Sequence, residues 1–243
     1  MKYQWVDEID GRVATENNMG FMFTDINGST PAFLDYVVKC AGTIIDIGCA
    51  YGVATLPALE KSKAKIIAFD LSQAHLNGLR EFITPQQAGR ITYVKGAFPN
   101  DFNYENNSLD AIHISYVLHY LSGEDFELGI KKCYDALKPD GKLFINTLSV
   151  HFCLFKHLVA DYEEKLAQGV PWPGIVDGIK DNQLSQSDSD NVPDSINLVS
   201  LAFLEQLLVE HHYTIDEAFY YDIKKPNTFG SDDKGCIAVV ASK

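Results

Sequence analysis

Two carboxylates and two glycines stand at spacings that suit the binding of a nucleoside-containing ligand. Asp46 lies in a β-branched apolar run, and Gly48 and Gly52 follow two and six positions later. Asp70 ends a second apolar run, 24 positions beyond Asp46. Glycines at both corners let the chain turn and let a ligand approach the backbone closely. A carboxylate at the tip of the next strand is placed to accept hydrogen bonds from ribose hydroxyls.

The residues after Gly52 predict a helix, with Pro57 in or near its first turn, where proline is tolerated. The amino end of a helix carries unpaired N–H groups and the positive end of the helix dipole. A strand, a glycine turn and a helix in this order form the ligand-binding unit of an open α/β sheet. Other parts of the chain must then supply the remaining walls.

The rest of the chain supplies the elements of such a sheet. Ser72, Ser122 and Ser200 predict helix N-caps, and so does Thr30, which precedes a proline. The patterns predict a Rossmann-like, doubly wound α/β fold: a mostly parallel seven-stranded sheet with an antiparallel C-terminal hairpin. The expected strands are 43–47, 65–69, 91–95, 109–115, 142–147, 213–223 and 235–242, with a turn at 139–141. The expected helices are 31–39, 72–82, 122–137 and 201–211.

Two segments stand outside this pattern in what we expect to be one domain, 1–243. Residues 1–42 hold Met19–Phe23, which either packs on the sheet edge or forms a lid in which Phe21 and Phe23 cover the ligand. Residues 148–196 form an insertion with a helix-like piece at 150–166 and a polar loop at 181–195. Its aromatic residues predict an acceptor cap with an apolar cavity, the core of a small helical cap, or a dimer contact; they are Phe152, Phe155, Tyr162 and Trp172.

The amino-acid composition disfavours some classes of binding partner. The 243 residues are 46% apolar and carry a formal net charge of −13, which argues against a nucleic-acid partner. Five cysteines without a Cys-x-x-Cys pair indicate reduced thiols and no zinc or other metal. No apolar leader and no run long enough to span a membrane is present, so we expect a soluble, cytoplasmic protein.

In their order, these motifs resemble the class I S-adenosylmethionine-dependent methyltransferases, over about residues 40–147 and 198–243. Residues 46–52 resemble the family's first motif, 69–70 its acidic tip, 96–98 its adenine contact, 109–119 its fourth motif and 137–143 its Leu-Lys-Pro-Gly-Gly turn. The resemblance implies S-adenosyl-L-methionine as cofactor and a methyltransferase activity. The cofactor-binding residues that it implies are Asp46, Gly48, Cys49, Ala50, Tyr51, Gly52, Asp70, Leu71, Gly96, Ala97, Phe98 and Ser115.

Two departures from the family pattern are visible. Ala50 and Tyr51 stand where the family commonly has Gly and Thr or Ser, and the Tyr51 ring could lie along the cofactor or the acceptor. Position 97 is Ala where the family usually has Asp. The adenine amino group would then be contacted from elsewhere, Asp101 being one option, while the backbone N–H of Ala97 or Phe98 could still bond the ring.

A dinucleotide-dependent oxidoreductase shares the strand–turn–helix unit and is the competing enzyme class. Its Gly-x-Gly-x-x-Gly pattern fails here at Ala50 and Val53. Asp46 would repel a pyrophosphate but attract the ammonium group of a methionine-derived cofactor. The sequence therefore favours methyl transfer over hydride transfer.

Methyl transfer from a sulfonium needs a nucleophile, the methyl group and sulfur on one line, with water excluded. Tyr116 and His119 are the candidate catalytic residues, because they follow the strand 109–115. His119 is either a general base with a pKa near neutrality or a structural histidine bonded to backbone. We expect a small-molecule acceptor. The alternative from another class is a cofactor-binding sensor or partner protein that transfers no methyl group.

Overall fold

The computed structural model describes residues 5, 8, 9, 11–182, 190–223 and 233–243. Its main sheet has seven strands in the order β10-β11-β7-β6-β3-β4-β5. Neighbours from β5 to β7 are parallel, while β7–β11 and β11–β10 are antiparallel, which confirms the predicted sheet and its hairpin. The strands are β3 (Thr43–Ile47), β4 (Lys65–Asp70), β5 (Ile91–Lys95), β6 (Leu109–Ser115), β7 (Leu137–Leu148), β10 (Thr214–Tyr221) and β11 (Cys236–Ser242).

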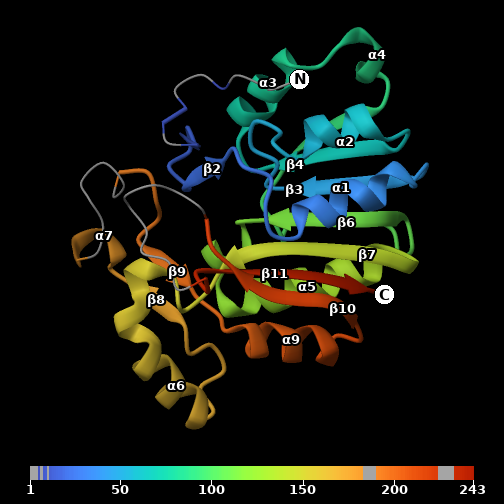
Figure 1. The fold of residues 1–243 in the computed structure, drawn as a ribbon. Helices are drawn as coiled ribbons and strands as arrows, with labels where there is room; N and C mark the ends of the chain where they lie inside the picture. The colour runs from blue at the N-terminus through green and yellow to red at the C-terminus, as the bar shows by residue number, and fades with distance from the viewer. Residues whose placement is uncertain (1–4, 6–7, 10, 183–189, 224–232) are drawn as a thin grey trace.

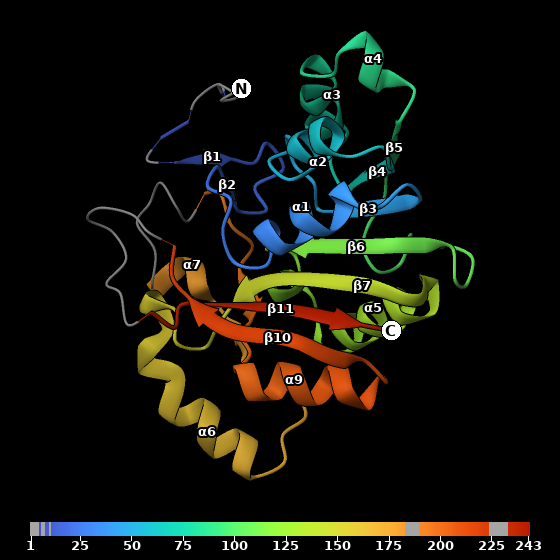
Figure 2. The same cartoon turned by 45° about the vertical axis from the view of Figure 1, so that its right-hand side comes forward.

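Helices cover both faces of this sheet, so the fold is doubly wound as predicted (Figures 1 and 2). Side chains alternate between the two faces along a strand, and the buried residues divide accordingly. One face packs against α1 (Thr30–Val38), α2 (Thr55–Lys61) and α3 (Gln73–Glu81). The other packs against α5 (Gly123–Ala136) and α9 (Leu201–Glu210), while the short α4 (Pro85–Ala88) leads into β5.

The predicted N-caps are confirmed at three helices. Ser72, Ser122 and Ser200 each accept a backbone N–H three residues on, at oxygen–nitrogen distances of 3.4, 3.1 and 3.2 Å. The prediction for Thr30 is wrong: α1 begins at Thr30 itself and Ser29 is its N-cap. The Thr30 hydroxyl bonds to side chains of the sheet instead. Pro57 is the third residue of α2, within the first turn as expected.

β7 begins earlier than predicted. The expected turn at 139–141 lies within the strand, where Asp140 adopts a φ of 64°. The pairing of β6 with β7 shifts register between Leu109 and Ala111, so the turn residues form an irregularity in a continuous strand. The functional consequence is small, because this end of β7 is the amino end.

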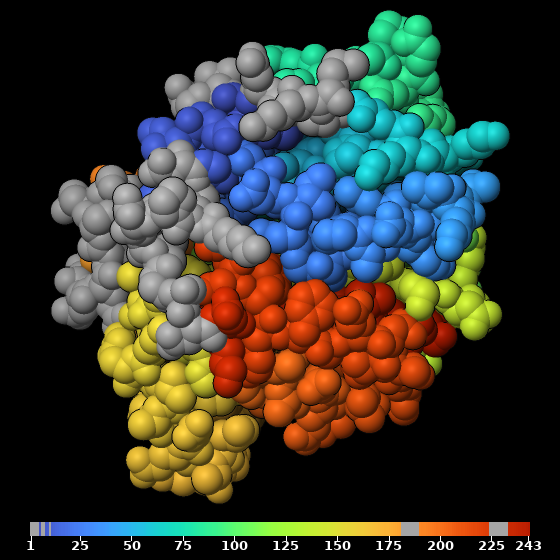
Figure 3. Space-filling model, viewed as in Figure 1, coloured from blue at the N-terminus to red at the C-terminus, as the bar shows by residue number. Residues whose placement is uncertain are grey.

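The two irregular segments meet at the carboxyl ends of the parallel strands. The arrow of β6 in Figure 2 points to the side that holds the N-terminal hairpin and the insertion, and Figure 3 shows their described atoms on that same side, in blue and yellow. The hairpin pairs β1 (Arg12–Ala14) with β2 (Phe21–Phe23). The insertion contains η2 (Cys153–Leu158), α6 (Val159–Ala167), β8 (Ile175–Asp177), α7 (Ile179–Asn182) and β9 (Ser195–Asn197).

The hairpin and the insertion are joined by a backbone hydrogen bond. The N–H of Gly20 donates to the carbonyl oxygen of Asn191 at 2.6 Å. Part of the polar loop expected at 181–195 lies outside the described residues. No helix among the described residues is long and apolar enough to cross a bilayer.

Candidate functional site

A pocket of about 190 Å³ opens over the carboxyl ends of β3, β4 and β6. The N-terminal hairpin forms its outer wall, so Met19, Phe21 and Phe23 line it together with the strand ends. The structure brings eleven of the predicted site residues into this main pocket: Asp46, Gly48, Cys49, Ala50, Asp70, Leu71, Gly96, Ala97, Phe98, Ser115 and Tyr116. Tyr51, Gly52 and His119 are not among the residues that line it.

The turn from Gly48 to Gly52 has a backbone conformation that favours glycine at both of its ends. Gly48 and Gly52 have φ values of 69° and 94°, which side-chain-bearing residues rarely adopt. A Cβ on Gly48 would overlap the side chain of Val117. The N–H groups of Gly48 and Cys49 both donate to the carbonyl oxygen of Phe69, at 2.8 and 3.2 Å. These two N–H groups therefore fix the turn to β4 and are already used by the fold.

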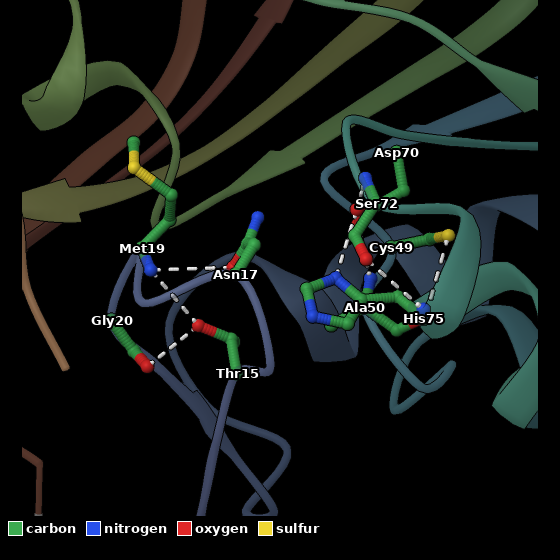
Figure 4. A network of polar contacts seen from close by, with 9 residues as sticks. All are labelled: Thr15, Asn17, Met19, Gly20, Cys49, Ala50, Asp70, Ser72 and His75. Atoms are coloured by element: carbon green, nitrogen blue, oxygen red, sulfur yellow. Dashed lines mark hydrogen bonds and ion pairs between the residues drawn. The ribbon is translucent and has the colours of Figure 1, made fainter.

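Asp70 is a buried carboxylate, 5% exposed, with three donors around it (Figure 4). Its Oδ2 accepts the N–H of Ala50 at 2.8 Å, and its Oδ1 accepts the N–H of Ser72 at 2.8 Å. Nδ1 of His75 lies 2.9 Å from the same Oδ1. A carboxylate has about four acceptor positions, so one remains for a ligand hydroxyl on the pocket side.

Asp46 is paired with a residue that sequence reasoning missed. Its Oδ1 lies 2.7 Å from Nδ1 of His113, and its Oδ2 accepts the hydroxyl of Thr55 at 2.6 Å. His113 stands opposite Asp46 in the parallel register of β3 and β6, so both side chains project from the same face. Only this register reveals the pair, because 67 positions separate the two residues in the chain.

The expected adenine contacts satisfy one another instead. The backbone N–H of Ala97 donates to Oδ2 of Asp101 at 2.8 Å, and the N–H of Asp101 donates to the carbonyl oxygen of Ala97 at 2.7 Å. Asp101 does not line the pocket. The expected adenine partners are Asp101 and the backbone N–H groups of Ala97 and Phe98. Asp101 and Ala97 bond to each other, whereas the N–H of Phe98 takes no part in this pair of hydrogen bonds.

Tyr51 lies behind the turn. Its ring packs edge-on against His75, with 5.0 Å between centroids, and a Cβ built on Gly78 would lie 2.9 Å from its Cδ1. It therefore supports α3 and does not lie along the pocket.

The two candidate catalytic residues occupy different surroundings. Tyr116 lines the main pocket, its hydroxyl lies 2.7 Å from that of Tyr221, and burial raises its pKa well above the usual value. His119 is buried in η1 (Leu118–Tyr120), and its Nδ1 lies 3.4 Å from the hydroxyl of Thr147. Burial lowers the pKa of His119 to about 3, which favours the structural histidine over the general base among the two alternatives.

A second cavity of about 80 Å³ adjoins the main pocket. Four side chains line both, namely Phe21, Phe23, Tyr116 and Tyr120. Phe152 and Phe155 of the insertion line the second cavity, as the sequence suggested. Its other walls are Arg12, His119, Leu148, Leu154, Ile179, Val192 and Ile196, so it is predominantly apolar.

The other two aromatic residues of the insertion are structural. The hydroxyl of Tyr162 donates to Ser200 at 3.2 Å, at the start of α9. Trp172 packs between Phe126 and Phe203, with ring centroids 5.3 and 5.2 Å away. They anchor the insertion to α5 and α9.

Comparisons with known proteins show which family of proteins this chain resembles. Residues 44–141 match the family described as "Methyltransferase domain". Carboxy-S-adenosyl-L-methionine synthases from Shewanella sp. (strain ANA-3) and Vibrio parahaemolyticus are 28% and 27% identical over 127 residues, 51% of this chain and 51% of each relative. The chain thus matches about half the length of these curated relatives.

Solved structures give the same fold. An S-adenosylmethionine-dependent methyltransferase from Mesorhizobium loti superposes with a TM-score of 0.60 at 16% identity, over 89% of this chain and 99% of that chain. One from Methanosarcina mazei superposes with a TM-score of 0.64 at 13% identity, over 87% and 96%. Residues 44–141 therefore match a methyltransferase domain family, and the main sheet of the chain has the fold of solved S-adenosylmethionine-dependent methyltransferases.

Proposed function

We propose that this protein transfers the methyl group of S-adenosylmethionine to a small, largely apolar molecule. The observation that carries the proposal is that the two cavities adjoin and share four lining residues. These are Phe21, Phe23, Tyr116 and Tyr120. One cavity has the two carboxylates expected of the cofactor site, and the other offers an apolar surface beside it. A methyl donor and an acceptor bound in adjoining cavities would meet at these shared side chains.

The charges of the main pocket suit this cofactor. S-adenosylmethionine carries a sulfonium, an ammonium and one carboxylate, so its net charge is positive. Asp46 and Asp70 line the pocket, and none of its lining residues within the described part of the chain is Lys or Arg. In this arrangement Asp70 would hold the ribose and Asp46 would face the ammonium group. A pyrophosphate would meet the same carboxylates unfavourably, which disfavours the oxidoreductase alternative.

The walls of the site support a small-molecule acceptor. We assign the N-terminal hairpin as a lid and the insertion as an acceptor cap within a single domain, because both line the second cavity. Its aromatic and aliphatic lining favours a flat or branched apolar molecule. The net charge of −13 and the five free cysteines are consistent with a cytoplasmic protein that does not bind nucleic acid.

The names of the curated relatives suggest a second candidate, the synthesis of carboxy-S-adenosylmethionine. That product carries an additional carboxylate next to the sulfur. The main pocket lacks a lining Lys or Arg among its described residues, so methyl transfer is favoured. Arg12 lines the second cavity, where its guanidinium lies 4.3 Å from the Phe21 ring centroid, so a carboxylated co-substrate bound there would lie near a cation.

Calorimetry with S-adenosylhomocysteine tests the cofactor assignment. We expect binding in the micromolar range for the wild type and a loss of at least tenfold for Asp70→Ala. Asp161→Ala is the control, since it removes an exposed carboxylate of α6 that does not line the pocket. Absence of binding to the wild type at high micromolar concentration would refute the proposal. Equal affinities for the wild type and Asp70→Ala would refute the role of Asp70.

Turnover separates an active enzyme from a cofactor-binding sensor. A panel of small apolar acceptors with hydroxyl, amine or thiol groups is incubated with S-adenosylmethionine, and S-adenosylhomocysteine formation is measured. Product formation that depends on the acceptor supports methyl transfer. Tight cofactor binding without turnover over the whole panel favours the sensor. Preferential binding of carboxy-S-adenosylmethionine would favour the second candidate.

A further inference from the structure

A chain of buried polar side chains crosses the sheet beneath the main pocket. The Thr55 hydroxyl donates to Asp46, Asp46 pairs with Nδ1 of His113, and Nε2 of His113 lies 3.1 Å from Oγ1 of Thr30. Nδ2 of Asn146 donates to the same Thr30 oxygen at 2.9 Å. All five residues are at most 4% exposed. Of these five residues, only Asp46 has a role in the cofactor site proposed above.

The strand register explains why these groups meet. Asp46 on β3 is opposite His113 on β6, and Ser115, two positions along, is opposite Asn146 on β7. Residues two apart on a strand share a face, so the side chains of Asp46, His113 and Asn146 all point toward α1. Thr30, the first residue of that helix, closes the chain.

The directions of the hydrogen bonds can be worked out from one backbone donor. The N–H of Ser29 can only donate, and it points at Oδ1 of Asn146 from 2.7 Å. This fixes the amide orientation, so Nδ2 of Asn146 must be the donor to Thr30. The single proton of the Thr30 hydroxyl is then available for its other recorded contact, Nε2 of His113. Because the Asp46 carboxylate only accepts, Nδ1 of His113 bears the ring proton.

We propose that Thr30 and His113 form a proton relay for the methyl acceptor, with Asp46 holding the imidazole that receives the proton. The inference rests on the proposed function and assigns catalytic chemistry within the same site. Thr30, His113 and Asp46 all line the main pocket. The O–H or N–H group of the methyl acceptor can donate a hydrogen bond to the second lone pair of Thr30 Oγ1, while the Thr30 hydroxyl donates its own proton to His113.

The relay conserves atoms and charge. The O–H or N–H bond of the acceptor breaks and its proton passes to Oγ1 of Thr30, while the Thr30 proton passes to Nε2 of His113. The freed electron pair forms the bond to the methyl carbon, and the electron pair of the carbon–sulfur bond stays on sulfur. The resulting imidazolium is stabilised by Asp46 at 2.7 Å.

Other titratable groups of the site are less suited to this role. Tyr116 is hydrogen-bonded to Tyr221, and burial raises its pKa. His119 lines the second cavity, but its Nδ1 lies 3.4 Å from the hydroxyl of Thr147 and burial lowers its pKa to about 3. His75 pairs with Asp70 as His113 pairs with Asp46, but its Nε2 has no recorded hydroxyl partner to bring it a proton.

Nuclear magnetic resonance of isotope-labelled histidine tests the relay without an acceptor. The His113 signals are assigned as those lost in His113→Gln. From the hydrogen-bond directions we expect a ring protonated at Nδ1 and unprotonated at Nε2. Thr30→Val, which replaces the hydroxyl by a methyl group, should shift the Nε2 resonance downfield, and Thr30→Ser should restore it. Thr55→Val removes the other hydroxyl partner of the Asp46–His113 pair and should leave Nε2 hydrogen-bonded.

A His113 ring protonated at Nε2, or an Nε2 resonance unchanged in Thr30→Val, overturns the relay. With the acceptor found in the panel, Thr30→Val should lower kcat by about 10²-fold or more while the affinity for S-adenosylhomocysteine stays the same. An unchanged kcat would likewise overturn the relay. Failure of the proposed function has a different signature, because S-adenosylhomocysteine would not bind although the histidine spectrum retained its pattern.

Discussion

Nδ1 of His75 lies 2.9 Å from Oδ1 of Asp70, and the His75 side chain is 3% exposed. His75 stands in the first turn of α3, so the helix that follows the strand supplies a donor to the carboxylate at the strand tip. The contact leaves the other oxygen of Asp70 to Ala50 and the ligand. The acidic tip is thus oriented by its own helix before any ligand binds.

We predict that His75→Phe weakens cofactor binding and stability together. The substitution removes one of three donors from a buried carboxylate, which costs about 1–3 kcal/mol of unfolding free energy. The affinity for S-adenosylhomocysteine should fall about five-fold to ten-fold, since roughly 1 kcal/mol of lost orientation corresponds to that factor. Calorimetry and urea unfolding measure the two effects. Gln73→Ala, on the exposed side of the same turn, is the control, and an unchanged affinity in His75→Phe would make His75 purely structural.

His119 predicts a specific pH dependence of stability. Burial lowers its pKa from 6.5 to about 3, so the unfolded chain takes up a proton below pH 6.5 that the folded chain takes up only near pH 3. Stability is therefore lost as the pH falls through this window, and the loss levels off at its lower end. Between about pH 8 and about pH 5 the contribution of His119 is about 2 kcal/mol.

His119→Gln should reduce the pH dependence by that amount. Urea unfolding at the two pH values gives the free-energy difference for wild type and variant. His157→Gln, at an exposed position of η2, provides the matched substitution. If His119→Gln and His157→Gln show the same difference between the two pH values, burial of His119 does not have the predicted effect.

Gly20 offers a test of the lid. Its φ is 107°, and a Cβ there would overlap the hydroxyl of Tyr120. We expect Gly20→Ala to displace the hairpin from the pocket and to lower the affinity for S-adenosylhomocysteine about ten-fold, in addition to a strain cost of about 1–2 kcal/mol.

Gly169→Ala separates strain from displacement. Gly169 has a φ of 77°, and a Cβ there would meet no atom within 4 Å. Its variant should therefore show the backbone cost by unfolding while the calorimetric affinity stays at the wild-type value. Equal affinity losses in both variants would contradict the assignment of the hairpin as a lid.

Most strands of the sheet could be predicted because each is marked by residues that are close together in the sequence. The runs 43–47, 91–95 and 109–115 coincide with β3, β5 and β6 to the residue. Each is a compact β-branched or apolar run bounded by turn residues, so the strand ends are encoded nearby. Asp46 and Asp70 could be placed at the pocket for the same reason: each occupies a strand that sequence pattern delimits.

The partners of those carboxylates could not be predicted, because they depend on register and tertiary contact. His113 meets Asp46 only through the pairing of β3 with β6. Thr30 is the informative error: the local Thr-Pro pattern suggested a cap, whereas two buried groups of the sheet take its hydroxyl. Asp101, likewise, is satisfied by Ala97 across a short loop.

The bond between Gly20 and Asn191 joins segments that lie 171 positions apart in the chain. If the hairpin is the lid and the insertion the acceptor cap that we propose, this hydrogen bond couples the two walls of the site. The family match at 44–141 contains neither of these segments. On the proposed function, the matched region would bind the cofactor, while the segments that would choose the acceptor lie outside it.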